Sequence, residues 1–313
     1  MAPLPRFIPD DVRIGFMARR HLAMAFSGAL VLLSLVLVFT VGLNFGIDFR
    51  GGSLIELRMP GPADLAAMRK VLSELDLGQV ELQNFGDERE VLIRIERQEG
   101  NEEAQRAAVE KVKQALVQAF GEGVEFRRAE YVGPKVSREL FWDGVFAVGL
   151  ALALVLVYIW FRFEWHFGAG AIIALFHDVI TTLGVFVVTG YEFNLSTVAA
   201  ILTIVGYSLN DTVIIYDRIR ENMRRYKTMP LDELIDRSIS ETLARTTMTS
   251  FTTLLALVVL YVVGPSVISG FTFAMIWGVI VGTYSSIYIA APILIHLGLR
   301  REAVAAPAAA TGS

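Results

Sequence analysis

Residues Leu22 to Leu43 read LAMAFSGALVLLSLVLVFTVGL, an apolar run without one charged side chain. As a helix, this run is long enough to cross the roughly 30 Å hydrocarbon core of a bilayer. A cleaved signal peptide is the alternative, because Arg13, Arg19 and Arg20 precede the run. The run is about twice as long as the apolar core of a signal peptide and lacks a convincing A-x-A cleavage site. We therefore expect a retained first span.

Five further apolar runs follow. They are Leu140 to Trp160, Ala169 to Thr189, Leu195 to Ile215, Met248 to Val263 and Val267 to Leu297. Of the 313 residues, 54% are hydrophobic and only 19% are charged, and the mean hydropathy is +0.52. The sequence predicts a polytopic α-helical membrane protein with six spans.

The segment between the first two spans has the composition of a water-soluble domain. Alternating apolar and polar residues predict strands at 53–59, 79–85, 90–97 and 124–131. Apolar residues at helical spacing predict helices at 63–75 and 102–120. The order β-α-β-β-α-β is the ferredoxin-like split pattern, so we expect an inserted α+β domain at residues 44–138. It gathers no cluster of histidine, serine or carboxylate side chains, which favours a binding or mechanical module over an enzyme.

Basic residues concentrate on one side of the alternating spans. They are Arg6, Arg13, Arg19, Arg20, Arg162, Arg218 to Lys227, Arg300 and Arg301. By the positive-inside rule we expect both termini in the cytoplasm and the inserted domain in the periplasm.

The expected organisation is a cytoplasmic segment at 1–21, a first span at 22–43, the inserted domain, and the other five spans at 139–299. Within the region 139–299, residues 216–245 are expected to form a cytoplasmic amphipathic segment between the fourth and fifth spans. Its second half, Pro230 to Arg245, is expected to lie on the membrane surface as a helix, with a solvated connector as the alternative. Residues 300–313 are expected to be a disordered tail.

Several kinds of chemistry are excluded by residues that the chain lacks. It has no cysteine, which removes disulfides, thiol catalysis and cysteine-based metal sites. Its formal net charge of −4 argues against nucleic acid as a partner. No Gly-Lys dipeptide occurs, which excludes the P-loop nucleotide signature. We expect no cofactor, no metal and no catalytic residues.

Two aspartates fall at membrane depth, where an ionisable side chain is a functional hypothesis by default. Asp178 lies in the third span beside His177, and a local hydrogen-bonded pair of these two is the purely structural alternative. Asp211 lies in the fourth span on a polar stripe with Thr197, Ser208 and Thr212, which we expect to face the bundle interior.

Arg245 stands at the cytoplasmic entrance of the fifth span and is the nearest long cation able to approach Asp211. Six hydroxyl side chains that could hydrate a path follow it: Thr246, Thr247, Thr249, Ser250, Thr252 and Thr253. A carboxylate that alternates between a wet cavity and a cation can bind and release a proton. A permanent Asp–Arg clasp that only fixes helix packing is the alternative.

Gly278, Gly282 and Ser286 recur every four residues in the sixth span, which makes a stripe on which another helix can pack closely. The neighbour could be internal or could belong to a partner subunit.

Four groups of residues together resemble the SecF branch of the SecD/SecF family of the bacterial Sec translocase. They are Gly46-Ile-Asp-Phe-Arg-Gly-Gly52, Val132-Gly-Pro-Lys135, Ala174-Leu-Phe-His-Asp178, and Tyr207-Ser-Leu-Asn-Asp-Thr212 continuing to Asp217-Arg-Ile-Arg-Glu-Asn222. The resemblance runs from about Arg13 to Leu299. The family belongs to the resistance-nodulation-division superfamily.

The resemblance implies a SecD partner in a heterodimer, the SecYEG channel, an emerging preprotein in the periplasm, and use of the proton motive force at the inner membrane. It implies a role in proton movement for Asp211 and Arg245. Asn210, Ser208 and Thr212 share the motif of Asp211 and are candidates for the proton pathway or for structural polar contacts. For Asp48, Arg50, Gly51 and Gly52 it gives a motif without a role, and a tight turn in which the glycines supply positive φ is the simpler interpretation.

Two other functions remain as alternatives. An intramembrane aspartyl protease would use Asp178 and Asp211 as a dyad that shares a proton. A small-molecule exporter of the same superfamily would need a substrate pocket and larger periplasmic domains.

Overall fold

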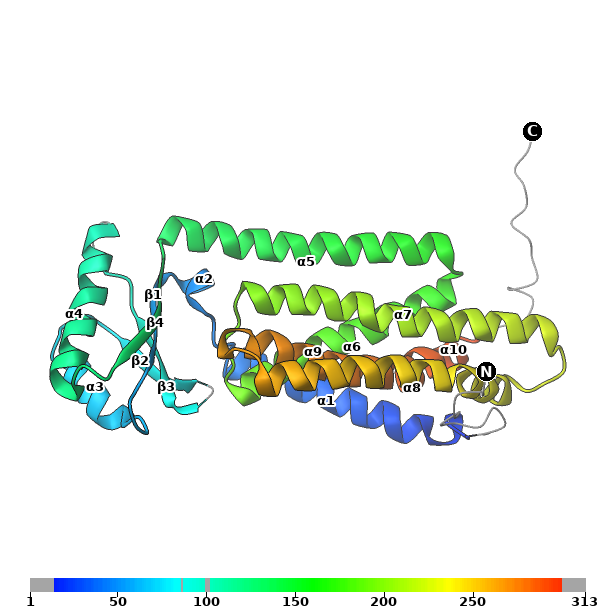
Figure 1. The fold of residues 1–313 in the computed structure, drawn as a ribbon. Coiled ribbons are helices and arrows are strands. Elements are labelled where there is room, and N and C mark those ends of the chain that lie inside the picture. The colour runs from blue at the N-terminus through cyan, green and yellow to red at the C-terminus, as the bar shows by residue number, and fades with distance from the viewer. Residues whose placement is uncertain (1–13, 86, 99–101, 300–313) are drawn as a thin grey trace, which may run out of the picture.

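The computed structural model describes residues 14–85, 87–98 and 102–299, which form a helical bundle and a smaller sheet domain at one end of it (Figure 1). The bundle contains α1 (Arg20–Thr40), α5 (Pro134–Arg162), α6 (Trp165–Thr189), α7 (Leu195–Arg225), α8 (Leu231–Val263), α9 (Ser269–Ser285), a π-helical turn (Ser286–Ala290) and α10 (Ala291–His296). Short 3-10 turns precede α1 (Met17–Arg19) and α9 (Ser266–Ile268). We call the end of the bundle next to the sheet its domain side, and the opposite end, where α1 begins, its terminal side.

Six helical stretches are long and apolar enough to cross a membrane, the last of them running from Ser269 to His296. This confirms the predicted multi-pass membrane fold. Burial separates the six into two groups: 50%, 56% and 72% of the apolar windows of the third, fourth and sixth stretches are buried, against 11% in each of the other three. Helices α6, α7 and α9 therefore form the centre of the bundle, and α1, α5 and α8 lie outside them.

The sheet domain confirms the predicted ferredoxin-like pattern. In chain order it contains α2 (Ile47–Arg50), β1 (Gly52–Arg58), α3 (Leu65–Ser73), β2 (Val80–Phe85), β3 (Asp87–Ile95), α4 (Glu102–Phe120) and β4 (Glu125–Val132). The strands are antiparallel in the order β2-β3-β1-β4. One face of the sheet forms a core with α3 and α4 through residues such as Ile55, Ile93, Met68 and Leu116. The opposite face is turned toward the bundle (Figure 1).

The segment at 230–245 differs from the expected surface helix. It is the first half of α8, because no glycine or proline interrupts the chain between Leu231 and Val263. Its apolar residues Leu234, Ile235 and Ile239 are buried in the main bundle core. An apolar stripe reads the same in sequence whether it packs against protein or lies on a membrane, and here it packs against protein.

The beginning of α8 is also fixed to the beginning of the first span. The Met17 N–H donates to Asp236 Oδ1 over 2.8 Å, and Arg20 Nη1 donates to Asp232 Oδ2 over 2.7 Å. These contacts explain why the first turns of α8 lie against the bundle.

The small-residue stripe of the sixth span packs inside the chain, against α7. A Cβ atom added at Gly278 would lie 2.3 Å from Ile204 Cγ1, and one added at Gly282 would lie 2.9 Å from Ser208 Cβ. Ser286 continues the series with a 2.8 Å hydrogen bond to Thr212. The two helices therefore run parallel, with residues four apart on one meeting residues four apart on the other.

Candidate functional site

Asp178 lies at the centre of a closed hydrogen-bond network. Its Oδ2 accepts from Ser208 Oγ on α7 at 2.6 Å and from Ser285 Oγ on α9 at 2.8 Å. Its Oδ1 is 2.9 Å from Nδ1 of His177. Asp178 is 1% exposed and His177 4% exposed. The carboxylate thus joins all three central helices, and each of its oxygens has a partner.

The last contact of this network depends on the end of α9. Ser285 and Ser286 are consecutive, yet Ser285 reaches Asp178 on α6 while Ser286 reaches Thr212 on α7. The π-helical turn begins at Ser286, and such turns interrupt the regular hydrogen-bond ladder of a helix. Within it, the Ala290 carbonyl accepts from the buried Tyr216 hydroxyl over 3.0 Å.

Asp211 has a different environment, although it lies on the same helix as Ser208. The residue is 1% exposed, and its Oδ2 is buried with no hydrogen-bond partner among the described residues. The stripe expected to face the interior is indeed buried, with Thr197 and Ser208 at 0% and Thr212 at 2%. Asp211 is thus a buried carboxyl group that the surrounding helices do not satisfy.

Arg245 does not form the clasp considered above. The residue is exposed on α8, and its charge acts on Asp211 from a distance. In the part of the chain that the structure describes, no ion pair joins the two side chains. The pair is therefore separated, with one member inside the bundle and the other on its outer face.

Five of the six hydroxyl side chains that follow Arg245 divide into two sets. Thr249, Thr252 and Thr253 donate to carbonyl groups of their own helix three or four residues earlier, as is common for threonine in a helix. Ser250 instead faces inward, between Tyr207 of α7 at 3.4 Å and Thr283 of α9 at 2.8 Å. Thr246, 2% exposed, has a buried hydroxyl without a partner among the described residues.

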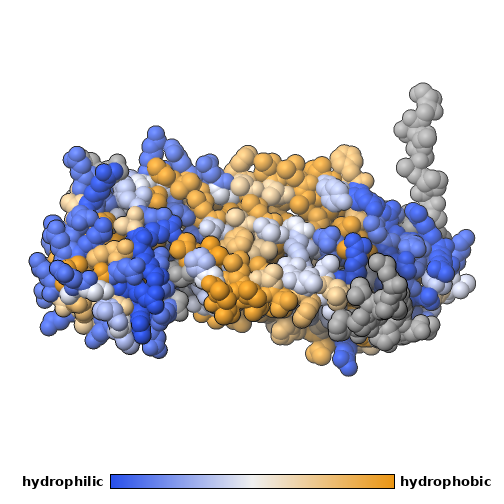
Figure 2. Space-filling view, in the orientation of Figure 1, coloured by the Kyte–Doolittle hydropathy of each residue, from blue (hydrophilic) through white to orange (hydrophobic). Residues whose placement is uncertain are grey.

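A polar area lies on the outside of the bundle next to Asp211. Asn210 is exposed there, away from Asp178 and its partners. The other exposed residues of this area that are not apolar are Thr203 and Gly206 of α7 and Arg245, Thr249 and Thr252 of α8. Figure 2 shows it as a pale area over α7 and α8 within the orange surface of the bundle. We call these six residues the polar face.

The segment Gly46 to Gly52 joins the sheet domain to α7. Asp48 Oδ2 accepts the Leu195 N–H over 2.9 Å, at the first residue of α7. Gly51 and Gly52 have φ of +74° and +110°, and a Cβ at Gly52 would lie 2.6 Å from the Ile95 carbonyl oxygen. Both glycines are required by the turn, as the simpler interpretation predicted. Arg50 lies at the edge, 3.9 Å from Glu81.

Arg94 on β3 makes a second connection that sequence reasoning missed. Its guanidinium contacts Glu192 in the loop before α7, Glu81 on β2 at 2.9 Å, and Asn44 after α1 at 3.2 Å. The side chain is only 10% exposed. A charged residue alternating with apolar residues in a strand predicts exposure, so the sequence carries no signal for this buried contact between domains.

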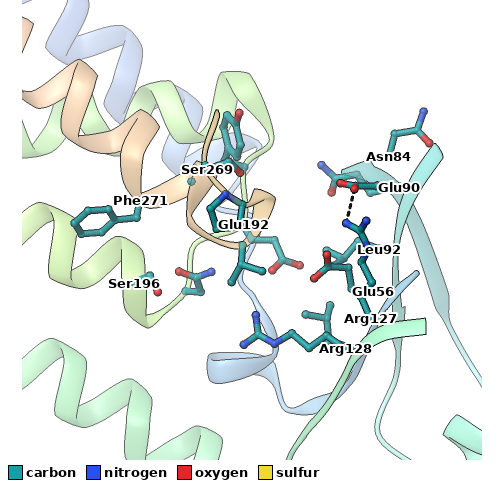
Figure 3. Close-up of a pocket in the computed structure, with 18 of the residues that line it drawn as sticks. Glu56, Asn84, Glu90, Leu92, Arg127, Arg128, Glu192, Ser196, Ser269 and Phe271 are labelled. Carbon is teal, nitrogen blue, oxygen red and sulfur yellow. Dashed lines mark hydrogen bonds and ion pairs between the residues drawn. The ribbon is translucent and has the colours of Figure 1, made fainter. Parts of the chain in front are cut away.

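A cleft of about 1060 Å³ separates the open face of the sheet from the domain side of the bundle. Charges of both signs line it (Figure 3). Glu56, Glu90 and Arg128 come from the sheet and Glu192 from the bundle. Arg127 of β4 and Glu90 of β3 form an ion pair at 2.6 Å, reaching over the strand β1 that lies between them. The cleft is polar, and the described residues that line it supply both carboxylate and guanidinium groups.

The two membrane-depth aspartates do not form the dyad that an aspartyl protease would need. Among the described residues, the oxygens of Asp178 contact only Ser208, Ser285 and His177, and no hydrogen bond links Asp178 to Asp211. The protease alternative therefore has no geometric support.

Comparisons with known proteins agree with this arrangement. The family described as "Protein export membrane protein SecD/SecF, C-terminal" matches residues 111–300, and the "SecD/SecF GG Motif" matches residues 36–59. The protein translocase subunit SecF of Rickettsia prowazekii is 46% identical over 296 residues, which cover 95% of this chain and 94% of that relative. The same subunit of Rickettsia bellii is 46% identical over 289 residues, or 92% and 95% of the two chains.

Two solved structures share the fold. The structure of SecDF, a translocon-associated membrane protein from Thermus thermophilus, matches with a TM-score of 0.85 at 36% identity. A super-membrane-facing form of SecDF matches with a TM-score of 0.68 at 34% identity. The matches cover 95% and 96% of this chain but only 40% of each SecDF chain.

Proposed function

The chain belongs to the SecD/SecF family of protein export membrane proteins, and on this basis we propose that it is an accessory subunit of the Sec protein translocase. In this proposal it acts with SecD and uses the proton motive force to promote preprotein export across the inner membrane. It performs no chemical catalysis.

The observation that carries the proposal is the environment of Asp211. Burying an ionised carboxylate without a partner is costly, so such a group exchanges between a charged and a neutral state as its surroundings change. Asp211 is buried with an oxygen that has no partner among the described residues, and the positive charge of Arg245 would favour its ionised form. A change in their separation would favour uptake or release of a proton. This is the requirement for a relay.

The distribution of charge supports an orientation with both termini in the cytoplasm and the sheet domain in the periplasm. The loops on the terminal side carry Arg162, Arg224 and Arg225, whereas the domain-side loops at 190–194 and 264–266 have no lysine or arginine. Basic residues are retained on the cytoplasmic side of short loops.

The polar face supports a partner in the membrane. Lipid tails would leave Asn210 and Arg245 without polar contacts at membrane depth, which is unfavourable. A second membrane subunit with polar groups of its own would cover this face and control access to Asp211. The match to 40% of SecDF is consistent with SecD as that subunit. The sheet domain, with its cleft, would then meet the emerging preprotein near the SecYEG channel.

The test is preprotein translocation into inverted membrane vesicles, with and without an uncoupler, at matched subunit levels. Asp211→Asn keeps the size and hydrogen-bonding capacity of the side chain but cannot carry a proton. We expect the variant to accumulate normally and translocation to lose its dependence on the proton gradient.

Asp217→Asn is the matched control, because Asp217 lies on the same helix in an exposed ion pair with Arg162 at 2.8 Å. It should retain uncoupler-sensitive stimulation. If Asp211→Asn also retains the full stimulation, Asp211 is structural and the proton relay is disproved.

A further inference from the structure

A wholly apolar pocket lies where α5 meets α6 and α7, near α2. Its volume is about 220 Å³, and every residue that lines it is apolar. One end is closed by the aromatic rings of Phe45, Phe49, Phe141 and Phe193, whose centroids lie 5.8 to 6.4 Å apart in neighbouring pairs. Gly144 of α5 lines the pocket beside them.

The flank of α5 that leads to this pocket is open at membrane depth. Only Ser137, Gly144 and Ile159 of α5 are buried. No residue between Gly144 and Ile159 is fully buried, although Leu152 and Val155 pack partly buried against the bundle core. The pocket residue Val145 is 49% exposed, so hydrocarbon chains of the bilayer can reach the pocket beside Gly144.

An exposed cation lies on α5 close to the pocket residue Phe141. Arg138 is one helical turn before Phe141, on the same side of α5 and toward the domain side. It is exposed and makes no hydrogen bond or ion pair with any described residue. Trp142 is next to Phe141, 62% exposed and packed edge to face on it at 5.7 Å. Tryptophan marks the boundary between hydrocarbon and headgroups, so Arg138 lies at headgroup level and the pocket just below it.

We propose that this pocket binds one acyl chain of a phospholipid whose phosphate is held by Arg138. Water gains nothing in a cavity without polar groups. A helix of a partner protein is about 10 Å across, so even one turn exceeds the space available. A flexible hydrocarbon chain joined to an anionic headgroup matches both the apolar lining and the unpaired cation. Bound there, it fastens α5 to α7 beside the Gly46 to Gly52 segment.

The test uses the full chain in nanodiscs that contain phosphatidylglycerol with a photoreactive diazirine within one acyl chain. Cross-links mapped by mass spectrometry should concentrate on pocket residues such as Val148 and Val198. Gly144→Leu places its side chain in the pocket, and its Cβ is accommodated at 3.8 Å from Phe49. We expect these cross-links to fall about tenfold in this variant.

Gly149→Leu is the matched control, since a Cβ there meets nothing within 4 Å on the same helix. It should leave the pocket cross-links unchanged. If Gly144→Leu is not monodisperse, Val145→Trp fills the pocket from an exposed position and should give the same loss. Equal labelling of Val148 and Val198 in filled and unfilled variants would overturn the acyl-chain site.

A second measurement tests the headgroup. Arg138→Gln should reduce the phosphatidylglycerol that stays bound through detergent purification, as measured by native mass spectrometry. Lys135→Gln is the control, because Lys135 is 89% exposed and already lies 3.9 Å from Glu139. Equal retention in the two variants would refute the role of Arg138.

Discussion

Asp178 and Asp211 are both 1% exposed and lie on neighbouring central helices, yet their surroundings are opposite. Asp178 has a hydrogen-bond partner for each oxygen, from three helices. Asp211 has a buried oxygen with none among the described residues. The comparison teaches that depth in the membrane does not by itself assign a role to a carboxyl group. A satisfied carboxylate fixes helices, whereas an unsatisfied one is free to change its protonation.

The largest expected difference is in stability. Asp178→Ala removes three hydrogen bonds at about 0.6–1 kcal/mol each, so we expect a loss of about 2–3 kcal/mol. Asp211→Ala removes no hydrogen bond that the described residues show, so its loss should be clearly smaller than that of Asp178→Ala. Thermal or denaturant unfolding of the purified chain in one detergent measures both. An equal loss for the two variants would mean that Asp211 has partners in the folded state and would break the comparison.

A smaller loss of stability is expected from a substitution that disturbs the surroundings of Asp178 but not those of Asp211. Gly282→Ala places a Cβ 2.9 Å from Ser208 Cβ, so Ser208, which donates to Asp178, has to shift. Overpacking of this kind costs about 1–3 kcal/mol. Gly206→Ala on α7 is the control, because a Cβ there meets nothing within 4 Å. That change should be neutral or slightly stabilising, since alanine favours helix over glycine. A harmless Gly282→Ala would contradict the close contact between α7 and α9.

The smallest effect on stability is expected at Arg245. The side chain is exposed and forms no ion pair with Asp211, so Arg245→Gln should change the unfolding free energy by less than about 0.5 kcal/mol. Stimulation of translocation by the proton gradient should nevertheless be lost, because glutamine carries no charge to act on Asp211. A clear loss of unfolding free energy in Arg245→Gln would instead support the Asp–Arg clasp.

The sequence was sufficient for the elements of the fold whose signal is local. The alternation in Ser53 to Met59 corresponds to strand β1, and the run from Leu22 to Leu43 corresponds to a span, although β1 is buried on both faces and not only on its apolar one. The order β-α-β-β-α-β of the elements along the chain was likewise predicted from local patterns.

Contacts between distant residues could not be predicted in the same way. Ser285 is 107 positions from Asp178, and only the packing of α9 against α6 brings the two together. The separation of Asp211 from Arg245 depends on how α7 packs against α8, which residue types do not encode. Likewise, the sequence did not decide which helix packs on the small-residue stripe. In the structure Gly278 and Gly282 contact α7 of the same chain.

The contact between Asp48 and the first residue of α7 has a mechanical consequence. Helix α7 is a rigid rod, and Asp211 lies roughly 24 Å along it from Leu195 at 1.5 Å per residue. If the sheet domain tilts this end by about 5°, geometry moves Asp211 by about 2 Å, which is the difference between a contact and a separated pair. Asp48 and Asp211 thus occupy two points on one lever. A force applied to the sheet domain outside the membrane would therefore displace a carboxyl group at membrane depth.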